Sequence, residues 1–250
     1  MVCLHGFMDT WRTWELVLPA LERRHNVLAL TLPGHAGGPR LEGPFDETRL
    51  LDAIEAGMDG AGIATAHLVG NSLGGYLALR LAERGRARTV VALAPAGGWA
   101  NANGSFRELL GFQIDLHEQL KAAAPHVDSI LASPQGRRRV TAPLTVNYEH
   151  IPTELLTHLV LGVAGCTAVE HLDEQAALDY DWQLDAERIT CPVRIVWGTA
   201  DRILTWPGAA ARYRRNRLTH ADWVVLDDVG HYPQLDVPLE TAQLILGFTS

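Results

Sequence analysis

Short apolar runs that end at Gly, Pro or Asn recur along this chain, with helix-like stretches between them. Such alternation is typical of parallel βα units. Because the runs are nearly continuous in Val, Ile and Leu, we expect strands that are buried on both faces. The predicted strands are Val2 to Leu4, Val27 to Leu30, His67 to Val69, Val90 to Leu93, Val193 to Trp197 and Trp223 to Leu226. The predicted helices are Trp14 to Arg23, Leu50 to Gly57, Leu73 to Glu83, Pro207 to Arg217 and Leu239 to Leu246.

The stretch from about Trp99 to Tyr180 breaks this rhythm, since its clearest patterns are helical, from Phe106 to Ala124 and from Glu154 to Val163. We expect a helical insertion over the carboxyl ends of the strands, where open α/β sheets bind ligands. The predicted fold is therefore α/β, a mostly parallel sheet flanked by helices with a helical cap. Residues 1–97 and 185–250 form its core, and residues 98–184 form the cap.

The most specific motif is Gly70-Asn71-Ser72-Leu73-Gly74-Gly75, which lies directly after one predicted strand and before a predicted helix. This G-x-S-x-G pattern, in its strand, turn and helix context, is typical of a nucleophile elbow. The turn holds the serine in a strained backbone conformation above the sheet, and the neighbours two residues away must be small. The alternative interpretation is a glycine-rich turn that happens to contain a serine.

A serine needs a base, and the base needs a carboxylate that orients it. Asp201 follows the strand Val193 to Trp197, and His231 follows the strand Trp223 to Leu226. Each taken alone has an ordinary explanation: Asp201 as a turn or cap residue, and His231 as a surface or packing residue. Their places at two successive strand ends, after a serine elbow, favour catalysis. Asp227 and Asp228 lie too near His231 along the chain and are interpreted as turn formers.

A third requirement is a pair of N–H donors for a developing oxyanion. The first predicted strand ends in His5-Gly6-Phe7, where a turn at the glycine can aim a backbone N–H into the site. We expect the backbone amides of Phe7 and Leu73 to form this oxyanion hole. The alternative for His5-Gly6 alone is an ordinary turn at the end of a strand.

Together these residues resemble the α/β-hydrolase superfamily, in particular its small capped serine esterases and carbon-carbon hydrolases. The resemblance is carried by His5-Gly6-Phe7, Leu32-Pro33-Gly34-His35, the elbow, Trp197-Gly198-Thr199-Ala200-Asp201 and Gly230-His231-Tyr232-Pro233. It implies a catalytic triad in the chain order Ser72, Asp201, His231, hydrolysis through an acyl-enzyme, and no cofactor. Haloalkane dehalogenases and epoxide hydrolases fit less well, because their elbow nucleophile is Asp.

The sequence departs from this family in two places. Family members carry a β-hairpin before the His-Gly strand, whereas here that motif begins at residue 5. The strand Val27 to Leu30 is then an uncovered sheet edge, so we hypothesise a shortened N-terminus or a homodimer whose partner subunit covers that edge. The second departure is at Thr31 and Gly38, where relatives often have Asp and Ser; it affects a loop beside the pocket and leaves the triad unchanged.

The function predicted from the sequence is cleavage of a carboxylic ester with a small or medium acyl group by a cofactor-independent serine hydrolase. The same triad also serves carbon-carbon hydrolases, lactonases, acyl transferases and lyases, and a non-catalytic ligand-binding or receptor protein is an alternative of another class. The sequence leaves the identity of the substrate open. Trp11, Trp14, Trp99 and Trp206 are expected in core or helix packing rather than in the pocket.

Charge, cysteine content and histidine spacing argue against nucleic-acid-binding, membrane-binding and metal-binding proteins. With 21 basic against 29 acidic residues, the net charge is −8, which gives no electrostatic support for binding nucleic acid or anionic membranes. Cys3, Cys166 and Cys191 are too far apart for a CxxC pair, and the histidines, including those of the insertion (His117, His126, His150, His158 and His171), lack metal-ligand spacing. We therefore expect a cytoplasmic protein without a metal, whose partner is a small-molecule acyl substrate.

Overall fold

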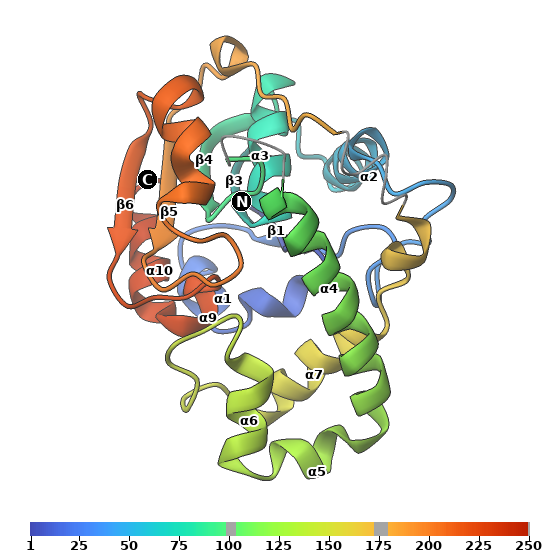
Figure 1. Ribbon diagram of the computed structural model, residues 1–250. Coiled ribbons are helices and arrows are strands. Elements are labelled where there is room, and N and C mark those ends of the chain that lie inside the picture. Colours follow the sequence, from blue (N-terminus) through green and yellow to red (C-terminus); the bar gives the residue numbers. More distant parts are fainter. Residues whose placement is uncertain (99–103, 173–179, 250) are drawn as a thin grey trace.

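One parallel sheet forms the core of the computed structural model, which describes residues 1–98, 104–172 and 180–249. Its six strands are ordered β2-β1-β3-β4-β5-β6 (Figure 1). They are β1 (Val2–Leu4), β2 (Leu28–Leu30), β3 (Ala66–Asn71), β4 (Ala87–Leu93), β5 (Val193–Gly198) and β6 (Asp222–Leu226). Each predicted strand is confirmed, although β3 and β4 begin earlier than predicted. The strand expected at a sheet edge, β2, is indeed the terminal strand.

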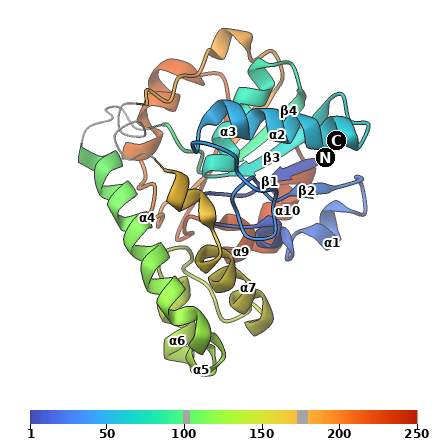
Figure 2. The same ribbon diagram turned by 90° about the vertical axis from the view of Figure 1, so that its right-hand side faces the viewer.

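Helices cover both faces of the sheet (Figure 2). On one face lie α2 (Glu47–Gly60) and α3 (Leu73–Glu83), and on the other lie α1 (Leu18–Leu21) and α10 (Pro238–Leu246). Successive side chains of a strand enter different cores, as the two-residue period of a strand requires. Val2 and Leu4 pack with α2 and α3, whereas Cys3 between them packs with α1 and α10. The apolar runs of the sequence are therefore fully buried strands.

The predicted helical insertion follows β4 and gathers at one end of the molecule (Figure 1). Both helices that the sequence predicted are present, and two shorter helices join them. The elements are α4 (Gly104–Ala123), a 3₁₀ turn (Ala124–His126), α5 (Val127–Leu131), α6 (Pro134–Thr141), α7 (Thr153–Ala164) and a second 3₁₀ turn (Thr167–His171). A further 3₁₀ turn (Ala186–Arg188) precedes β5. No helix of the described ranges combines the length and apolar character that crossing a bilayer requires.

Two predicted helices were wrong. The segment Trp14 to Arg23 forms a 3₁₀ turn (Trp11–Trp14) and then the short α1, because Pro19 lacks the N–H and restricts the residue before it, so a helix can only start there. The segment Pro207 to Arg217 forms a 3₁₀ turn (Gly208–Ala210) and a π turn (Tyr213–Arg217). Here a tertiary contact overrides helical periodicity, since the Arg212 N–H donates to the Gly98 carbonyl at 2.7 Å.

The loop that carries His231 is tied to the insertion by one buried carboxylate. Asp236, at the end of α9 (Pro233–Asp236), accepts the backbone N–H groups of Val146 at 2.9 Å, Asn147 at 2.7 Å and Gly230 at 2.6 Å. Its side chain is buried, and all of these donors are neutral amides. Since a buried carboxylate must be compensated by hydrogen bonds, this cluster fixes the insertion against the loop.

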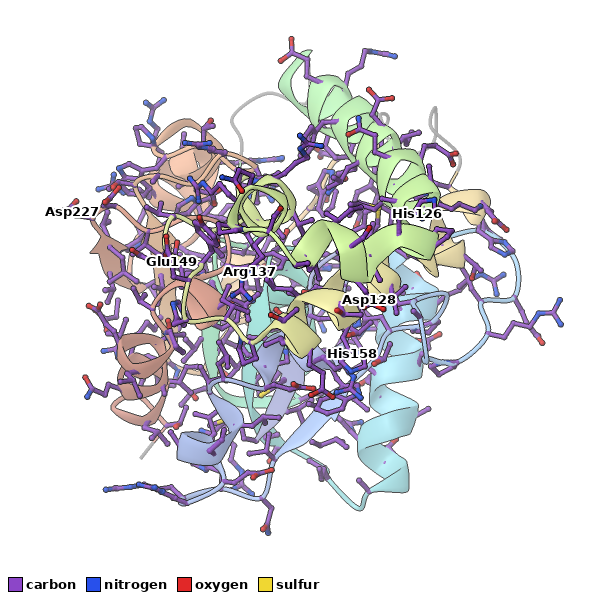
Figure 3. All side chains as sticks on the ribbon, turned by 90° about the horizontal axis from the view of Figure 1, so that it is seen from below. His126, Asp128, Arg137, Glu149, His158 and Asp227 are labelled. Atoms are coloured by element: carbon purple, nitrogen blue, oxygen red, sulfur yellow. The ribbon has the colours of Figure 1, made fainter. Side chains whose placement is uncertain are left out.

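Within the insertion, Arg137 of α6 holds the segment that leads into α7. Its guanidinium donates to the backbone carbonyls of Glu149 at 3.3 Å and Ile151 at 2.6 Å, and to the hydroxyl of Thr153 at 2.5 Å. Figure 3 shows Arg137 and Glu149 together on this side of the molecule, with Asp227 set apart beside β6. The insertion is therefore a structured layer with polar connections of its own.

Replacement of Asp236 by Ala should remove the shared partner of three backbone amides. Because each buried donor left without a partner costs about 1–3 kcal/mol, the free energy of unfolding should fall by about 3 kcal/mol or more. Urea unfolding at constant m-value measures this loss. The matched control is Asp227→Ala in the exposed turn after β6, where a change within about 0.5 kcal/mol is expected. Equal losses in both variants would contradict the assigned role of Asp236.

Candidate active site

Ser72 lies at the turn between β3 and α3 in a backbone conformation that non-glycine residues rarely adopt. Its φ is 53° and its ψ is −116°, as the elbow motif predicted. The turn is held by hydrogen bonds from the Ser72 N–H to the Leu93 carbonyl at 2.9 Å and from the Ala96 N–H to the Ser72 carbonyl at 3.0 Å. Ser72 is 8% exposed and lines two cavities. Its side chain is thus presented by a strained and fixed backbone.

The glycines of the elbow are required by close backbone approach. A Cβ at Gly70 would lie 2.1 Å from the Gly74 carbonyl oxygen, and one at Gly74 would lie 2.2 Å from the Leu4 carbonyl oxygen. A Cβ at Gly6 would lie 3.3 Å from that of Ser72, so the loop after β1 also packs against the elbow. These contacts bring the His5 loop to the start of α3, as expected for an oxyanion hole.

Phe7 and Leu73, whose amides the sequence predicts as oxyanion donors, both line the larger of the two cavities at Ser72. Leu73 is the first residue of α3, so its N–H has no partner four residues back in that helix. Within the described ranges, neither amide donates to another backbone group. The oxyanion hole formed by these two amides stays a prediction.

The side chain of His5 orients the peptide group to which the Phe7 N–H belongs. His5 Nε2 accepts the Leu32 N–H at 2.9 Å, so its proton is on Nδ1, which donates to the Gly6 carbonyl at 2.7 Å. Burial holds the pKa of His5 well below its ordinary value, with His35 adding to this effect, so the ring stays neutral. Because C=O and N–H of a trans peptide point in opposite directions, the bond to the Gly6 carbonyl directs the Phe7 N–H away from His5. The sequence indicated Gly6 and did not reveal this role.

His231 and Asp201 meet at the carboxyl ends of β5 and β6. His231 Nδ1 lies 2.7 Å from Asp201 Oδ2, and both side chains are buried. The other oxygen of Asp201 accepts the N–H groups of Ile203 at 2.9 Å and Leu204 at 2.8 Å. The carboxylate therefore shapes its own turn with one oxygen and binds the imidazole with the other. His231 lines the smaller cavity together with Ser72, and Asp227 and Asp228 lie in the turn after β6, as predicted.

A network behind the site, which the sequence analysis missed, joins the elbow to the His231 loop. The Asn71 side-chain amide donates to the Leu93 carbonyl at 3.1 Å and to the His231 carbonyl at 3.0 Å. Gln234 donates to Asn71 Oδ1 at 3.3 Å and to the Thr13 hydroxyl at 3.0 Å. Asn71 stands at the variable position of the motif, so no sequence signal marked its side chain. It fixes the main chain of His231 relative to Ser72.

Asp9 is a buried carboxyl group beside the same loop. Its Oδ1 accepts the Thr10 N–H at 2.7 Å. Burial raises the pKa of Asp9 to about 7, against smaller lowering effects of the Thr10 N–H, the hydroxyls of Thr13 and Tyr232, and the imidazole of His231. Asp9 therefore changes its charge near neutral pH within the surroundings of His231.

Other candidates lie elsewhere. Trp14 is buried in the core on the α1 face, Trp206 lies near Trp197 and Trp223, and Trp99 falls outside the described residues. Trp182, which the sequence did not single out, lines the larger cavity. In the described part of the chain, no three His, Cys, Asp or Glu residues are grouped as metal ligands would be.

Comparisons with known proteins show which family and fold this chain resembles. A model of the alpha/beta hydrolase family matches residues 1–244. Epoxide hydrolase EphH of Mycobacterium tuberculosis is 32% identical over 80% of this chain and 92% of its own length. A pimeloyl-[acyl-carrier protein] methyl ester esterase of Neisseria meningitidis serogroup B is 28% identical over 93% of this chain and 85% of its own. A meta-cleavage product hydrolase of Pseudomonas fluorescens IP01 has a similar fold, with a TM-score of 0.75 at 18% identity, covering 99% of this chain and 89% of that one.

The raised pKa of Asp9 predicts a distinct pH dependence of stability. An Asp with a folded-state pKa of about 7 binds its proton more tightly when folded than when unfolded. Its favourable contribution is complete below about pH 4 and is lost as pH rises through 7. The free energy of unfolding of the wild type, minus that of Asp9→Asn, should therefore fall by up to about 4 kcal/mol over this range. Urea unfolding at a series of pH values measures it; parallel curves for the two proteins would refute the prediction.

Proposed function

Because this chain belongs to the alpha/beta hydrolase family, we propose that it is a cofactor-independent serine hydrolase that cleaves a carboxylic ester through an acyl-enzyme. The observation that carries the proposal is the 2.7 Å contact of His231 with Asp201, in a loop that borders the same cavity as the strained Ser72. An aligned serine, imidazole and carboxylate constitute the machinery of acyl transfer. The relative named as a methyl ester esterase supports ester chemistry.

In the proposed mechanism, Ser72 Oγ attacks the ester carbonyl while His231 Nε2 takes the hydroxyl proton. Asp201 holds the proton on Nδ1 and stabilises the imidazolium. The Phe7 and Leu73 amides bind the oxyanion, and collapse of the intermediate expels the alcohol, which takes its proton from His231. A water molecule, deprotonated by His231, then attacks the acyl carbonyl; the bond to Ser72 Oγ breaks, His231 returns the proton to Ser72, and the acid leaves. Each donor to the oxyanion is worth about 2.7–4 kcal/mol in such sites.

The relative named as an epoxide hydrolase favours a second candidate, opening of an epoxide ring. In the family members that open epoxides, the elbow nucleophile is Asp, whereas this chain has Ser72. A hydroxyl nucleophile with an oxyanion hole suits attack on a carbonyl, so we place ester hydrolysis first. Initial rates on p-nitrophenyl esters, vinylogous diketones, lactones and styrene oxide separate ester cleavage from carbon-carbon, lactone and epoxide hydrolysis.

Replacement of Ser72 by Ala should reduce ester hydrolysis by several orders of magnitude, because the acyl-enzyme cannot form. The urea midpoint should be unchanged, since Ala also carries a Cβ and fits the same backbone. A fluorophosphonate probe should label the peptide that contains Ser72 in the wild type and leave Ser72→Ala unlabelled. Equal turnover by the two proteins would exclude the mechanism, and a wild type that is neither labelled nor active would favour the non-catalytic ligand-binding alternative.

Replacement of His5 by Phe tests the orientation of the Phe7 amide. The variant keeps the ring and loses the bond to the Gly6 carbonyl, so kcat should fall roughly tenfold to a hundredfold with KM little changed. His5→Asn, whose amide can donate to the same carbonyl, should recover part of the loss. If kcat is equal in both variants and the wild type, His5 has no positioning role.

The expected cytoplasmic location and the homodimer that covers β2 stay hypotheses. The free thiols of Cys3, Cys166 and Cys191 favour a reducing compartment. Sedimentation velocity measures the oligomeric state directly.

A further inference from the structure

Two cavities of unequal size meet at Ser72. The larger is about 360 Å³ and extends between α2, α3 and the start of α4, while the smaller is about 60 Å³ and extends beneath α6 and α7. Phe7, Ser72 and Gln113 line both. A substrate whose carbonyl lies at Ser72 thus has one roomy side and one narrow side.

The position of His231 decides which part of an ester occupies which cavity, given the function proposed above. His231 lines only the smaller cavity. The leaving alcohol must take its proton from that imidazole, so the alcohol belongs on this side. The acyl group then extends into the larger cavity. At about 60 Å³ against about 360 Å³, the alcohol side offers less room than the acyl side.

The larger cavity is mostly apolar and ends at a polar cluster. Its walls include Phe45, Leu50, Phe106, Leu110 and Trp182. At its far wall, Glu47 Oε2 accepts the Tyr76 hydroxyl at 2.5 Å and also accepts the Tyr180 hydroxyl. The two phenol oxygens are 2.8 Å apart, and all three residues line the cavity. We call Glu47, Tyr76 and Tyr180 the acyl-end cluster.

The acyl-end cluster has more hydrogen-bond acceptors than donor hydrogens. Tyr76 and Tyr180 bring one phenolic hydrogen each, and Arg80 Nε donates to Glu47 Oε1 at 2.9 Å. The acceptors are the two carboxylate oxygens, the two phenol oxygens and the Gln183 carbonyl, which lies 3.0 Å from the Tyr76 hydroxyl. The single Tyr76 hydrogen cannot serve Glu47, Tyr180 and Gln183 at once. A ligand that brings a hydrogen-bond donor would complete the cluster.

The charge of the same wall disfavours an anionic group. Arg80 is shared between Glu47 and Glu83, so this trio carries a net negative charge. Asp46 also lines the cavity, but its carboxylate is paired with Arg49 at 3.1 Å, so the negative charge of this wall comes from the trio. A carboxylate at the end of an acyl chain would therefore meet repulsion from this wall.

We propose that the acyl-end cluster selects acyl groups of medium length that are apolar along their length and carry a neutral hydrogen-bond donor, such as a hydroxyl, at the far end. Tyr76 follows Ser72 by one helical turn, about 6 Å along the axis of α3, so a chain from Ser72 runs beside the helix to reach the cluster. A site that hydrogen-bonds a substrate hydroxyl discriminates strongly against analogues that lack it.

The test compares three methyl esters of equal carbon count: hexanoate, ω-hydroxyhexanoate and the monomethyl ester of adipic acid. For the wild type, kcat/KM should be at least about tenfold higher for ω-hydroxyhexanoate than for hexanoate, and lowest for the adipate ester. Equal kcat/KM for all three esters, or a preference for the adipate ester, would overturn the proposal.

Two variants assign the preference to the cluster. Glu47→Gln should lower the preference for ω-hydroxyhexanoate over hexanoate and raise relative turnover of the adipate ester. Tyr180→Phe should lower the hydroxyl preference with little loss of packing, and it serves if Glu47→Gln fails to fold. The matched control is Asp52→Asn on the exposed side of α2, which should leave all three ratios unchanged. A wild-type ratio in both Glu47→Gln and Tyr180→Phe would also overturn the proposal.

Failure of this inference is distinguishable from failure of the proposed function. If the wild type cleaves the esters through Ser72 without discrimination, only the acyl-end cluster is refuted. If no ester is cleaved, titration calorimetry of Ser72→Ala with the three esters still reports selectivity: tighter binding of ω-hydroxyhexanoate supports the cluster, and equal binding refutes it.

Discussion

The close packing of main chain around the elbow is the constraint on which the site depends. At Gly70 and Gly74, the backbones of β3, α3 and β1 approach so closely that no side chain fits between them. This contact restricts the backbone of Ser72 to a conformation with positive φ, and it brings the loop after β1 to the start of α3. Local strain is therefore maintained by the packing of three elements, rather than by the turn itself.

Buried carboxylates organise the loops around this point, and backbone amides rather than cations compensate two of them. Asp201 uses one oxygen to close its own turn and the other to hold His231. Asp236 accepts hydrogen bonds from backbone amides of two segments, one in the insertion and one in the loop that carries His231. Such groups fix loop geometry because amides are directional donors. The turn-forming role of Asp201 is thus confirmed, and its contact with His231 uses the other oxygen, so it is compatible with the catalytic role that stays a prediction.

The sequence predicted all six strands of the sheet and the elbow before α3, because continuous apolar runs and the spacing of glycines encode burial and close approach directly. It placed Ser72, Asp201 and His231 after the carboxyl ends of three strands for the same reason. It failed at Pro207 to Arg217, where a contact with Gly98 decides the backbone. It also missed the hydrogen-bonding roles of His5 and Asn71 and the existence of the acyl-end cluster. Most of the partners in these contacts lie far away in the chain, and hydrogen bonding between distant segments leaves no periodic signal.

The contacts between the insertion and the His231 loop limit how the insertion can be exchanged between related proteins. Tyr232 and Leu235 pack in the core of the insertion, and Asp236 and the Tyr232 amide bond to residues 144–147. The helical insertion is thus not an independent module, because it shares apolar contacts and hydrogen bonds with the loop that carries His231. A chimera that places the insertion of a relative on this core would also need the relative's segment equivalent to residues 230–236. Without that segment, the loop that carries His231 would lose its hydrogen bonds to the insertion. A change in the insertion would therefore alter both the shape of the pocket and the position of the His231 imidazole.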